Sequence, residues 1–539
     1  MRSWRKFWPA LWLLLILALV AGVRIRLLSI PLERDEGEYA YAGQLILEGA
    51  PPYQLVYNMK MPGVYAAYAL MMAVFGQSSA GIRLGFMLVN MAAIVLMYFL
   101  GRRFLDRAGA VAASAAYALL SLSPCLQGFN AHATHFVVLA VLAATLALLR
   151  ARERGRLAGF FWSGALFGIA FLMKQPGGAF AFFGAALLLW EAARRNPPEW
   201  KKDGARLAAY GAGVAAPIVL TGAVLWRAGV WGKFWWWTVA YARVHATALP
   251  WKFVKERMAS PLTNWAWDEL FWALALAGLI WLLSRKGRAE EKFFFLSLLF
   301  FSAASVCPTF HFTSHYFVLM LPVVALLAAR ACEAAADGLA AQPLALARGA
   351  PWILFGLMWG GVAWSCLDSF CLSRPREVAA RAYGFNDFQV YPVIANYLKG
   401  HSPPTATLAV LGSEPELFFY AHRRSVTGYI YMYDVVQEQP MRRQMEEEMI
   451  SEVERGRPDY VVFVNQVLSW LPYPASCWDT IRNWLMVYTQ RDYVPCGVVT
   501  FAPHQYFWGS DCLQRVPLSR RFVVLFQRKP AASLPGTAP

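Results

Sequence analysis

The stretch that decides the fold lies near the N-terminus, where FWPALWLLLILALVAGVRIRLLSIP (residues 7–31) is followed closely by Arg34-Asp35-Glu36-Gly37-Glu38-Tyr39. The first part is long and apolar enough to cross a bilayer, which takes about 20 mainly apolar residues in a helix. The second part carries three carboxylates within four residues. Because ionisable groups beside a bilayer either stay solvated or serve a function, this cluster predicts chemistry just outside the first span.

The composition of the whole chain supports a membrane protein. Hydrophobic residues make up 58% of the 539 residues and charged residues only 15%, whereas about a quarter of the residues in a soluble protein are charged. The formal net charge of +17 does not indicate nucleic-acid binding. Its basic residues cluster in short loops between apolar runs, as the positive-inside rule describes.

Apolar runs of spanning length recur along the first 370 residues. They predict an α-helical polytopic membrane protein with about eleven transmembrane helices, at residues 7–31, 83–101, 108–128, 133–150, 157–174, 177–193, 206–228, 264–283, 292–309, 315–330 and 350–369. We interpret the first span as an uncleaved anchor, because no convincing A-x-A cleavage pattern follows it. The basic loops alternate along the chain, so they share one side if the N-terminus is cytoplasmic.

The opposite, extracytoplasmic side then holds the first long loop, residues 32–82, and everything after about residue 372. Within the loop, residues 62–76 are apolar but too short to cross, which favours an amphipathic helix along the interface. After residue 373 the apolar runs shorten to strand length at 407–411, 460–464 and 522–526, with a helical pattern at 441–455. This alternation predicts a transmembrane domain, 1–372, and a small extracytoplasmic α/β domain, 373–539.

Asp35-x-x-Glu38 has the spacing of a capping box, with Asp35 as the N-cap of a helix that Gly49 and Pro51-Pro52 would end. Capping alone could explain these residues. It does not explain why Glu36 is also acidic, or why Lys60 follows at loop distance. A carboxylate at a helix N-terminus is kept ionised by the helix dipole and can also act as a general base.

Other polar residues fall on the same predicted side. Lys174 interrupts an apolar stretch, where it could either snorkel to the interface or contact a lipid phosphate; Arg83 stands at the entrance of the second span. Four histidines also lie on this side, namely His132, His135, His311 and His315. Single histidines are usually structural, and no carboxylate accompanies these at helical spacing, so the sequence predicts no metal site and gives a divalent cation no support.

Taken in order, these motifs resemble the GT-C superfamily of integral-membrane glycosyltransferases. The closer resemblance is to bacterial relatives of protein O-mannosyltransferases and of the lipid A aminoarabinose transferase. It rests on residues 1–330 and on these motifs: Asp35-Glu36 with Tyr39, Lys60-x-Pro62, Phe75-Gly76 followed by Arg83, Lys174-Gln175, and His315-Tyr316 leading into Leu321-Pro322.

The resemblance implies an inverting transfer of a sugar from a polyprenyl-phosphate donor to an acceptor hydroxyl on a glycan, lipid or protein. It assigns Asp35 as the catalytic base, with Glu36 orienting the site. Substrate contacts fall on Tyr39, Lys60, Arg83, Lys174, His315 and Tyr316. The implied location is a bacterial inner membrane, the implied co-substrate is the lipid-linked sugar, and no other cofactor is expected.

One departure leaves other functions open. Many bacterial relatives carry a carboxylate near the start of the fourth span, where this chain has Ala133-Thr134-His135. A non-catalytic membrane scaffold is therefore an alternative. A secondary transporter is another, although its charges and broken helices would be expected at the midplane rather than at the outer rim.

The alternation of basic loops makes the orientation testable. A reporter that is active only in the cytoplasm, fused after Gly412, should be silent, because the positive-inside rule places this position outside. A phosphatase that works only outside the cytoplasm should be active at the same fusion point. A bright cytoplasmic reporter would reverse the orientation and move the acidic loop to the cytoplasmic side.

Overall fold

The computed structural model describes residues 4–247, 269–285, 288–339, 345–384, 386–470, 479–501, 503–516 and 521–530. Helices form at all eleven expected spans: α1 (Trp4–Arg26), α4 (Ser79–Gly101), α5 (Arg107–Leu120), α6 (Ala133–Arg154), α7 (Leu157–Met173), α8 (Gly178–Arg194), α9 (Trp200–Arg227), α13 (Glu269–Ser284), α14 (Ala289–Val306), α15 (Leu321–Gly338) and α16 (Ala345–Ser365). The first residues of the span expected at 264–283 and the end of the domain expected at 373–539 lie outside the described residues.

Six of the helical segments are both long and apolar enough to cross a membrane, namely Phe7–Arg26, Ser79–Gly101, Ala133–Arg154, Gln175–Arg194, Trp200–Arg227 and Ser314–Gly338. The chain is therefore a polytopic helical membrane protein, while the count of eleven spans stays a prediction. Short helices connect the long ones: the 3-10 helices η1 (Gln175–Gly177), η3 (Pro308–Phe310) and η4 (Ser314–Met320), the π-helices η2 (Trp236–Tyr241) and η6 (Asp368–Leu372), and the α-helices α10 (Trp231–Trp235) and α11 (Ala242–Thr247).

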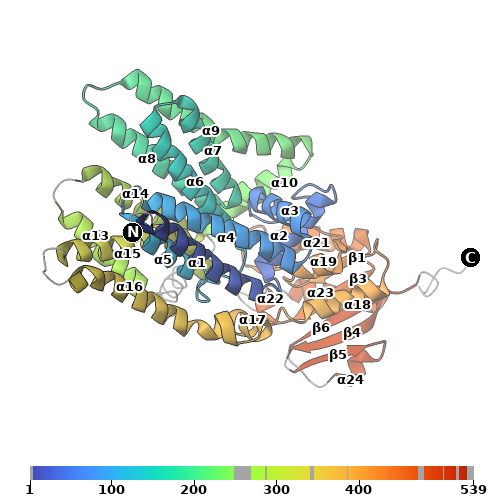
Figure 1. The fold of residues 1–539 in the computed structure, drawn as a ribbon. Coiled ribbons are helices and arrows are strands. Elements are labelled where there is room, and N and C mark those ends of the chain that lie inside the picture. The colour runs from blue at the N-terminus through green and yellow to red at the C-terminus, as the bar shows by residue number, and fades with distance from the viewer. Residues whose placement is uncertain are drawn as a thin grey trace, which may run out of the picture.

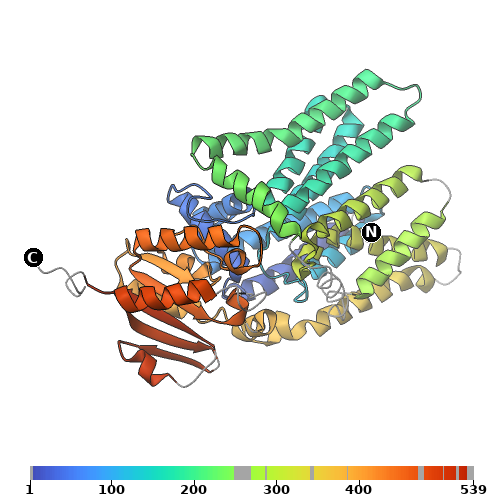
Figure 2. The same ribbon diagram turned by 180° about the vertical axis from the view of Figure 1, so that it is seen from behind.

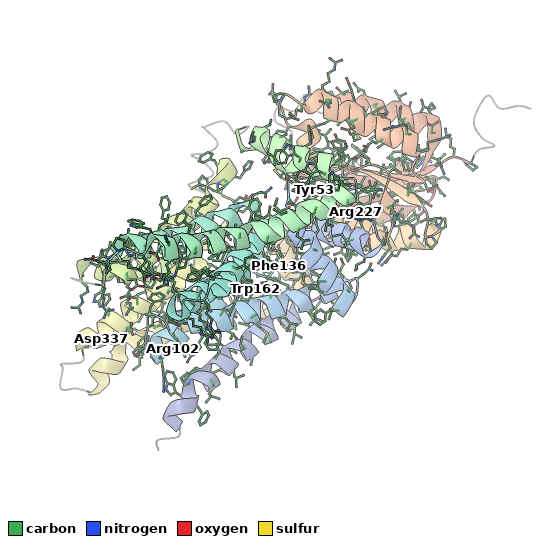
Figure 3. The ribbon with its side chains drawn as sticks, turned by 90° about the horizontal axis from the view of Figure 1, so that it is seen from above. Tyr53, Arg102, Phe136, Trp162, Arg227 and Asp337 are labelled. Atoms are coloured by element: carbon green, nitrogen blue, oxygen red, sulfur yellow. The ribbon has the colours of Figure 1, made fainter. Side chains whose placement is uncertain are left out.

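The bundle has two distinct ends. Arg102 and Asp337 lie at one end, and Tyr53 and Arg227 lie at the other, beside the C-terminal part of the chain (Figure 3). Helices α7, α8 and α9 form a wing that diverges from α13, α15 and α16 (Figures 1 and 2). Residues 321–330 of α15 are all buried, and the helix packs against α5, α13 and α16.

The first long loop, residues 32–82, is called the first outer loop after its expected side, and it folds into two helices, α2 (Arg34–Leu47) and α3 (Pro62–Phe75), which pack on each other. Helix α3 forms where an interfacial helix was expected, and it is two-sided: Tyr65 and Tyr68 are buried, whereas Leu70 and Val74 are exposed. Gly49, with φ of 84°, follows the end of α2 as expected, since glycine adopts this left-handed backbone conformation without strain.

The start of α2 differs from the expected capping box. Glu33, not Asp35, is the N-cap: its side chain accepts a hydrogen bond from the Glu36 backbone N–H, and the Glu36 side chain accepts one from Glu33 N–H. Asp35 is the second residue of the helix, two positions after the N-cap. The assignment of Asp35 as N-cap was wrong because Glu33 and Glu36 have the same three-residue spacing as Asp35 and Glu38. Asp35 is thus free of a capping role.

The chain after residue 374 forms a six-stranded mixed sheet with helices on both sides. The strands are β1 (Thr407–Leu411), β2 (Arg424–Ser425), β3 (Tyr460–Asn465), β4 (Tyr493–Phe501), β5 (His504–Trp508) and β6 (Phe522–Arg528), in the order β2-β1-β3-β6-β4-β5. The pairings β2-β1 and β1-β3 are parallel and the others antiparallel. Its helices are α17 (Pro375–Tyr383), α18 (Tyr391–His401), α19 (Glu416–Ala421), α20 (Tyr433–Val436), α21 (Arg442–Gly456), α22 (Val467–Trp470), α23 (Asp479–Asp492) and α24 (Cys512–Arg515).

The three strands expected from the sequence are β1, β3 and β6, and the expected helix is α21. The small α/β region is thereby confirmed. It lies at the end of the bundle next to α2 and α3 (Figures 1 and 2). The division of the chain into two domains at residue 372 stays a prediction.

The two faces of this sheet are buried against different partners, because successive side chains in a strand point to opposite faces. Ala409 and Leu411 belong to the core under α21 and α23. Leu408 and Val410 belong to a core that also contains residues of α2, α3, α18 and α19. The first outer loop and the sheet therefore share one hydrophobic core, which fixes the sheet's position over the start of α2.

A buried ionic contact reinforces this junction. The Arg34 guanidinium, from the first turn of α2, donates to the Ser413 carbonyl and to Glu414 Oε1, the latter over 3.1 Å. Helix α19 approaches α2 so closely that a Cβ on Gly37 would stand 2.5 Å from the Glu416 Cβ. Glycine at position 37 is thus a condition of this packing.

Glu416 is completely buried at the junction, and neither of its carboxyl oxygens has a hydrogen-bond partner. Burial, together with the neighbouring Glu414, raises the pKa of Glu416 well above its usual value. A raised carboxyl pKa stabilises the fold below the unfolded-state value of about 4.3, and this stabilisation is lost as the pH rises toward the folded-state pKa.

Glu416→Gln should remove that pH dependence, because glutamine resembles the protonated acid in shape. Its apparent Tm in detergent should gain on the wild type as the pH rises from about 5 to 9, because the wild-type free energy of unfolding falls by up to about 1.4 kcal/mol per pH unit while the unfolded chain ionises and the folded one does not. A Tm difference that stays constant across this range would contradict a neutral Glu416.

Candidate active site

The centre of the site is an ion pair between α2 and the loop before α3. Lys60 Nζ donates to Asp35 Oδ1 over 2.7 Å and to Glu38 Oε2 over 2.6 Å. The same ammonium lies 4.8 Å from the ring centroid of Tyr39, a separation at which the ring face attracts a cation. Asp35 and Glu38 are one helical turn apart, so a single lysine reaches both carboxylates.

The electrostatics of the pair decide which groups are charged. Burial alone would raise the pKa of the Asp35 carboxyl, but the positive charge of Lys60 outweighs it and holds that pKa well below its usual range. Burial would lower the pKa of Lys60, and the two carboxylates raise it instead. Asp35 is therefore an ionised carboxylate at neutral pH.

Glu38 is the fixed member of this group. It is completely buried, and its oxygens accept hydrogen bonds from Tyr65 over 2.5 Å and from Asn58 over 3.1 Å, in addition to Lys60. Asp35 is the accessible member, since about a quarter of its side chain remains exposed. Only the accessible carboxylate can meet a substrate, which favours Asp35 over Glu38 as the reactive group.

Glu36 and Arg83 form a second, fully buried pair. Arg83 Nη2 donates to Glu36 Oε2 over 2.9 Å, and its other donors reach the carbonyl groups of Ile30, Pro31 and Phe129. Glu36 Oε1 accepts from the Ala131 N–H over 2.7 Å. Both side chains are thus engaged with protein partners, and the pair ties the start of α2 to the loop that carries His132.

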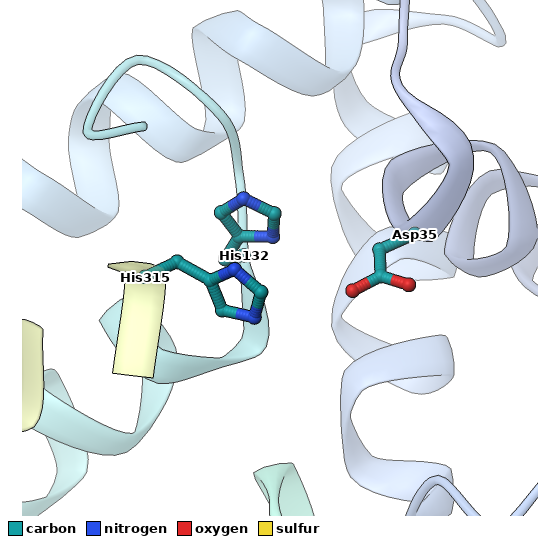
Figure 4. A group of neighbouring side chains, drawn as sticks. All are labelled: Asp35, His132 and His315. Atoms are coloured by element: carbon teal, nitrogen blue, oxygen red, sulfur yellow. The ribbon is translucent and has the colours of Figure 1, made fainter. Parts of the chain in front are cut away.

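Two histidines lie opposite Asp35. The rings of His132 and His315 stack with their centroids 4.0 Å apart, from the loop before α6 and from η4, and they face the Asp35 carboxylate (Figure 4). His132 Nε2 pairs with Gln127 Oε1 over 3.1 Å, whereas Nδ1 of neither ring has a hydrogen-bond partner among the described residues. His132 Nδ1 lies 3.7 Å from Glu33 Oε1. Burial lowers the pKa of His132 to about 3, so this ring is neutral.

Lys174 is a further basic residue at this end of the bundle. Its ammonium lies 3.9 Å from the ring centroid of Tyr316 and, within the described ranges, forms no ion pair with a carboxylate. The adjacent Gln175 donates to the Met59 carbonyl, next to Lys60. A lysine that faces an aromatic ring and no carboxylate is suited to an anion supplied from outside the protein.

The expected site residues therefore separate into those that lie around Asp35 and Lys174 and those that form the buried pair. Asp35, Tyr39 and Lys60 form one contact group, Tyr316 and Lys174 form another, and His315 faces Asp35. Glu36 and Arg83 instead form the buried pair described above. Sequence reasoning named His132 only among four histidines and missed Glu38 as a partner of Lys60. The three-residue step from Asp35 to Glu38 was the available signal.

Asp35, His132 and His315 can also be read as a metal centre, because one ligand atom from each lies within 4.8 Å of the others. A carboxylate and two neutral imidazoles with free nitrogens are suitable ligands for a divalent transition metal. The charges around them oppose a dication, however, since Lys60 already binds Asp35 Oδ1. The donor set fits, and the neighbouring ammonium group is the feature against it.

Residues 59–226 match the family model described as dolichyl-phosphate-mannose-protein mannosyltransferase. No curated protein sequence matches the chain.

Among solved structures, ArnT from Cupriavidus metallidurans bound to undecaprenyl phosphate is 17% identical, with a TM-score of 0.56, over 98% of this chain and 99% of that one. The Archaeoglobus fulgidus oligosaccharyltransferase tethered with an acceptor peptide is 12% identical, with a TM-score of 0.55, over 96% of this chain and 76% of that one. The oligosaccharyltransferase AglB from the same organism, in complex with an inhibitory peptide and a dolichol-phosphate, is 13% identical over 98% of this chain and 76% of that one, with a TM-score of 0.55.

The fold and the buried ionic site define a polytopic membrane protein with a charged centre at one end of its helical bundle. The matches confirm the resemblance to the GT-C superfamily at the level of the fold, which this chain shares along nearly its whole length with ArnT.

The role of a metal can be decided by chelation. Treating the purified protein with EDTA should leave the activity measured for it within about twofold of the untreated value, because Lys60 already supplies positive charge at the site. Mass spectrometry of the same sample gives the metal content independently of activity. Loss of activity that Mn²⁺ restores would instead assign Asp35, His132 and His315 as metal ligands.

Proposed function

We propose that this protein is a membrane glycosyltransferase that moves a sugar from a polyprenyl-phosphate donor to an acceptor hydroxyl on the extracytoplasmic side. The observation that carries the proposal is the pairing of two unlike features. One is an ionised, partly accessible carboxylate, Asp35; the other is a half-buried lysine, Lys174, that forms no ion pair with a carboxylate of the described chain. A base beside an anion site is what transfer from a sugar phosphate requires.

The reaction follows from these two groups. Asp35 takes the proton of the acceptor hydroxyl as the oxygen forms a bond to the anomeric carbon. The bond between that carbon and the phosphate oxygen breaks, its electron pair leaves with the lipid phosphate, and the configuration inverts. Lys174 and Lys60 offset the negative charge on the leaving phosphate. General base catalysis typically contributes about 10²–10⁴-fold, with electrostatic stabilisation adding a comparable factor.

The remaining residues divide between contact and support. Tyr39 lies against Lys60, Tyr316 lies against Lys174 and His315 faces Asp35, so these three are proposed to contact the substrates. Glu36 and Arg83 are proposed to position the site rather than touch a substrate, because their polar atoms are already paired inside the protein. A divalent cation held by Asp35, His132 and His315 would supply further positive charge for the phosphate.

Several features support this function against the alternatives. The ionic groups gather at the outer end of the bundle, beside the C-terminal sheet, whereas a transporter is expected to carry them at the midplane. A non-catalytic scaffold gives no reason for an accessible ionised carboxylate. The lipids bound in the matched structures, undecaprenyl phosphate with ArnT and dolichol-phosphate with AglB, are polyprenyl phosphates. A bacterial inner membrane is the proposed location.

Asp35→Asn tests the base directly. Asparagine preserves the size of the side chain and can still accept a hydrogen bond from Lys60, but it cannot take a proton at neutral pH. The variant should express normally and lose roughly 10²-fold or more in transfer rate with a defined polyprenyl-phosphate sugar.

The matched control is Asp106→Asn at the opposite end of the bundle. Asp106 caps α5 by accepting the Gly109 N–H, and asparagine is as good an N-cap as aspartate. Turnover in this variant should equal the wild type. Near-normal turnover in Asp35→Asn would refute the assignment of the base.

Lys174→Met tests the phosphate contact. Removing the ammonium should raise the KM for the lipid donor about 10-fold or more, since a charge-assisted hydrogen bond to phosphate is lost. Arginine at this position should rescue only partly, because its planar fork differs from a compact ammonium. Donor titrations at saturating acceptor measure the effect.

The control for this change is Lys233→Met. Lys233 also lies over an aromatic ring, 4.1 Å from the centroid of Tyr57, but Glu448 neutralises it over 2.5 Å. The Lys233→Met variant should leave the donor KM unchanged. An unchanged donor KM in Lys174→Met would return Lys174 to a purely structural role.

A further inference from the structure

The C-terminal sheet region contributes a side chain to the site. Tyr431, from the loop between β2 and α20, donates its hydroxyl to Asp35 Oδ1 over 3.1 Å, across 396 positions of sequence. Its side chain is almost fully buried, and Lys60 Nζ lies 5.1 Å from its ring centroid. Asp35 is therefore held by one group from the first outer loop and by one from the far end of the chain.

Both groups use the same carboxylate oxygen. Lys60 and Tyr431 donate to Asp35 Oδ1, and no hydrogen bond from another described residue reaches Oδ2. The carboxylate as a whole faces His132 and His315 (Figure 4). Two donors on one oxygen fix the rotation of the carboxylate plane, and they leave the other oxygen as the acceptor for a proton from outside.

The backbone around Tyr431 is held on both sides, so the position of its hydroxyl is well defined. The Gly428 carbonyl accepts from the Tyr57 N–H over 2.7 Å. The Met432 N–H donates to Ser413 Oγ over 2.9 Å. A Cβ on Gly428 would collide with the Tyr57 ring, so this close approach requires glycine. The loop is thus clamped to the first outer loop on one side and to the sheet on the other.

We infer that Tyr431 is a positioning residue for the transfer reaction: with Lys60 it fixes Asp35 so that Oδ2 takes the proton of the acceptor hydroxyl. The inference rests on the proposed function, in which Asp35 is the base. It makes the C-terminal region part of the catalytic unit rather than a lid over it. Misorientation of a catalytic group by about 1 Å can cost up to 10²-fold in rate, so the loss of this hydroxyl should be measurable.

Tyr431→Phe removes only the hydroxyl. We expect kcat to fall by about 10-fold while the KM for the donor stays within about twofold, because the side chain acts on the base rather than on donor binding. The matched control is Tyr429→Phe, two residues away. Tyr429 is equally buried and donates to Glu448 Oε2 over 2.8 Å, so this variant loses a comparable hydrogen bond outside the site and should keep wild-type kcat.

A double-mutant cycle separates action through Asp35 from general damage. Once Asp35→Asn has removed the base, adding Tyr431→Phe should cause no further loss of rate. Wild-type kcat in Tyr431→Phe, an equal loss in Tyr429→Phe, a change confined to KM, or fully additive losses in the cycle would each overturn the inference. If Asp35→Asn alone keeps wild-type activity, the proposed function fails instead, and the two failures are thereby distinguished.

Discussion

The structure depends on the contact of Lys60 with Asp35 and Glu38. Glu38 is fully buried and about three quarters of Asp35 and Lys60 is buried, and a charge transferred from water into a protein must be compensated by partners. Lys60 compensates both carboxylates at once, which allows the acidic turn of α2 to lie inside the protein. That turn also carries Arg34 and Glu36, and these pair with Glu414 and Arg83. The first turn of α2, which carries both acidic and basic side chains, thereby connects the membrane bundle, the first outer loop and the C-terminal sheet.

One cation near this turn has no carboxylate within ion-pair distance in the described chain. Arg34, Lys60 and Arg83 each have a carboxylate partner, whereas Lys174 lies against Tyr316 without one among the described residues. The site is therefore built with a place for an external negative charge. A phosphate on a lipid donor satisfies this need, which gives the proposed function an electrostatic basis that does not depend on resemblance.

Much of the fold could be predicted from the sequence, because span length and strand length are local properties. All eleven expected spans form helices, and β1, β3 and β6 occur where short apolar runs predicted them. Strands β4 and β5 were not predicted. Strand β4 begins with Tyr-Val-Pro-Cys-Gly, and Pro and Gly are unfavourable in strands. Strand β5 begins with two exposed polar residues, His504 and Gln505. In the site, the proximity of Asp35 and Lys60 could be predicted because they are close in sequence. The pairing of Arg83 with Glu36 and the contact of Tyr431 with Asp35 could not be predicted, because they join distant segments of the chain.

The contact between Tyr431 and Asp35 also determines when during synthesis of the chain the site can form. The two residues are 396 positions apart, and ribosomes add about 5–20 residues per second, so roughly 20–80 s separate their synthesis. During that interval the acidic turn of α2 has already been made, while the sheet that covers it does not yet exist. A chain that ends before Tyr431 thus lacks this contact, and the site gains its geometry only once the segment that carries Tyr431 has been synthesised.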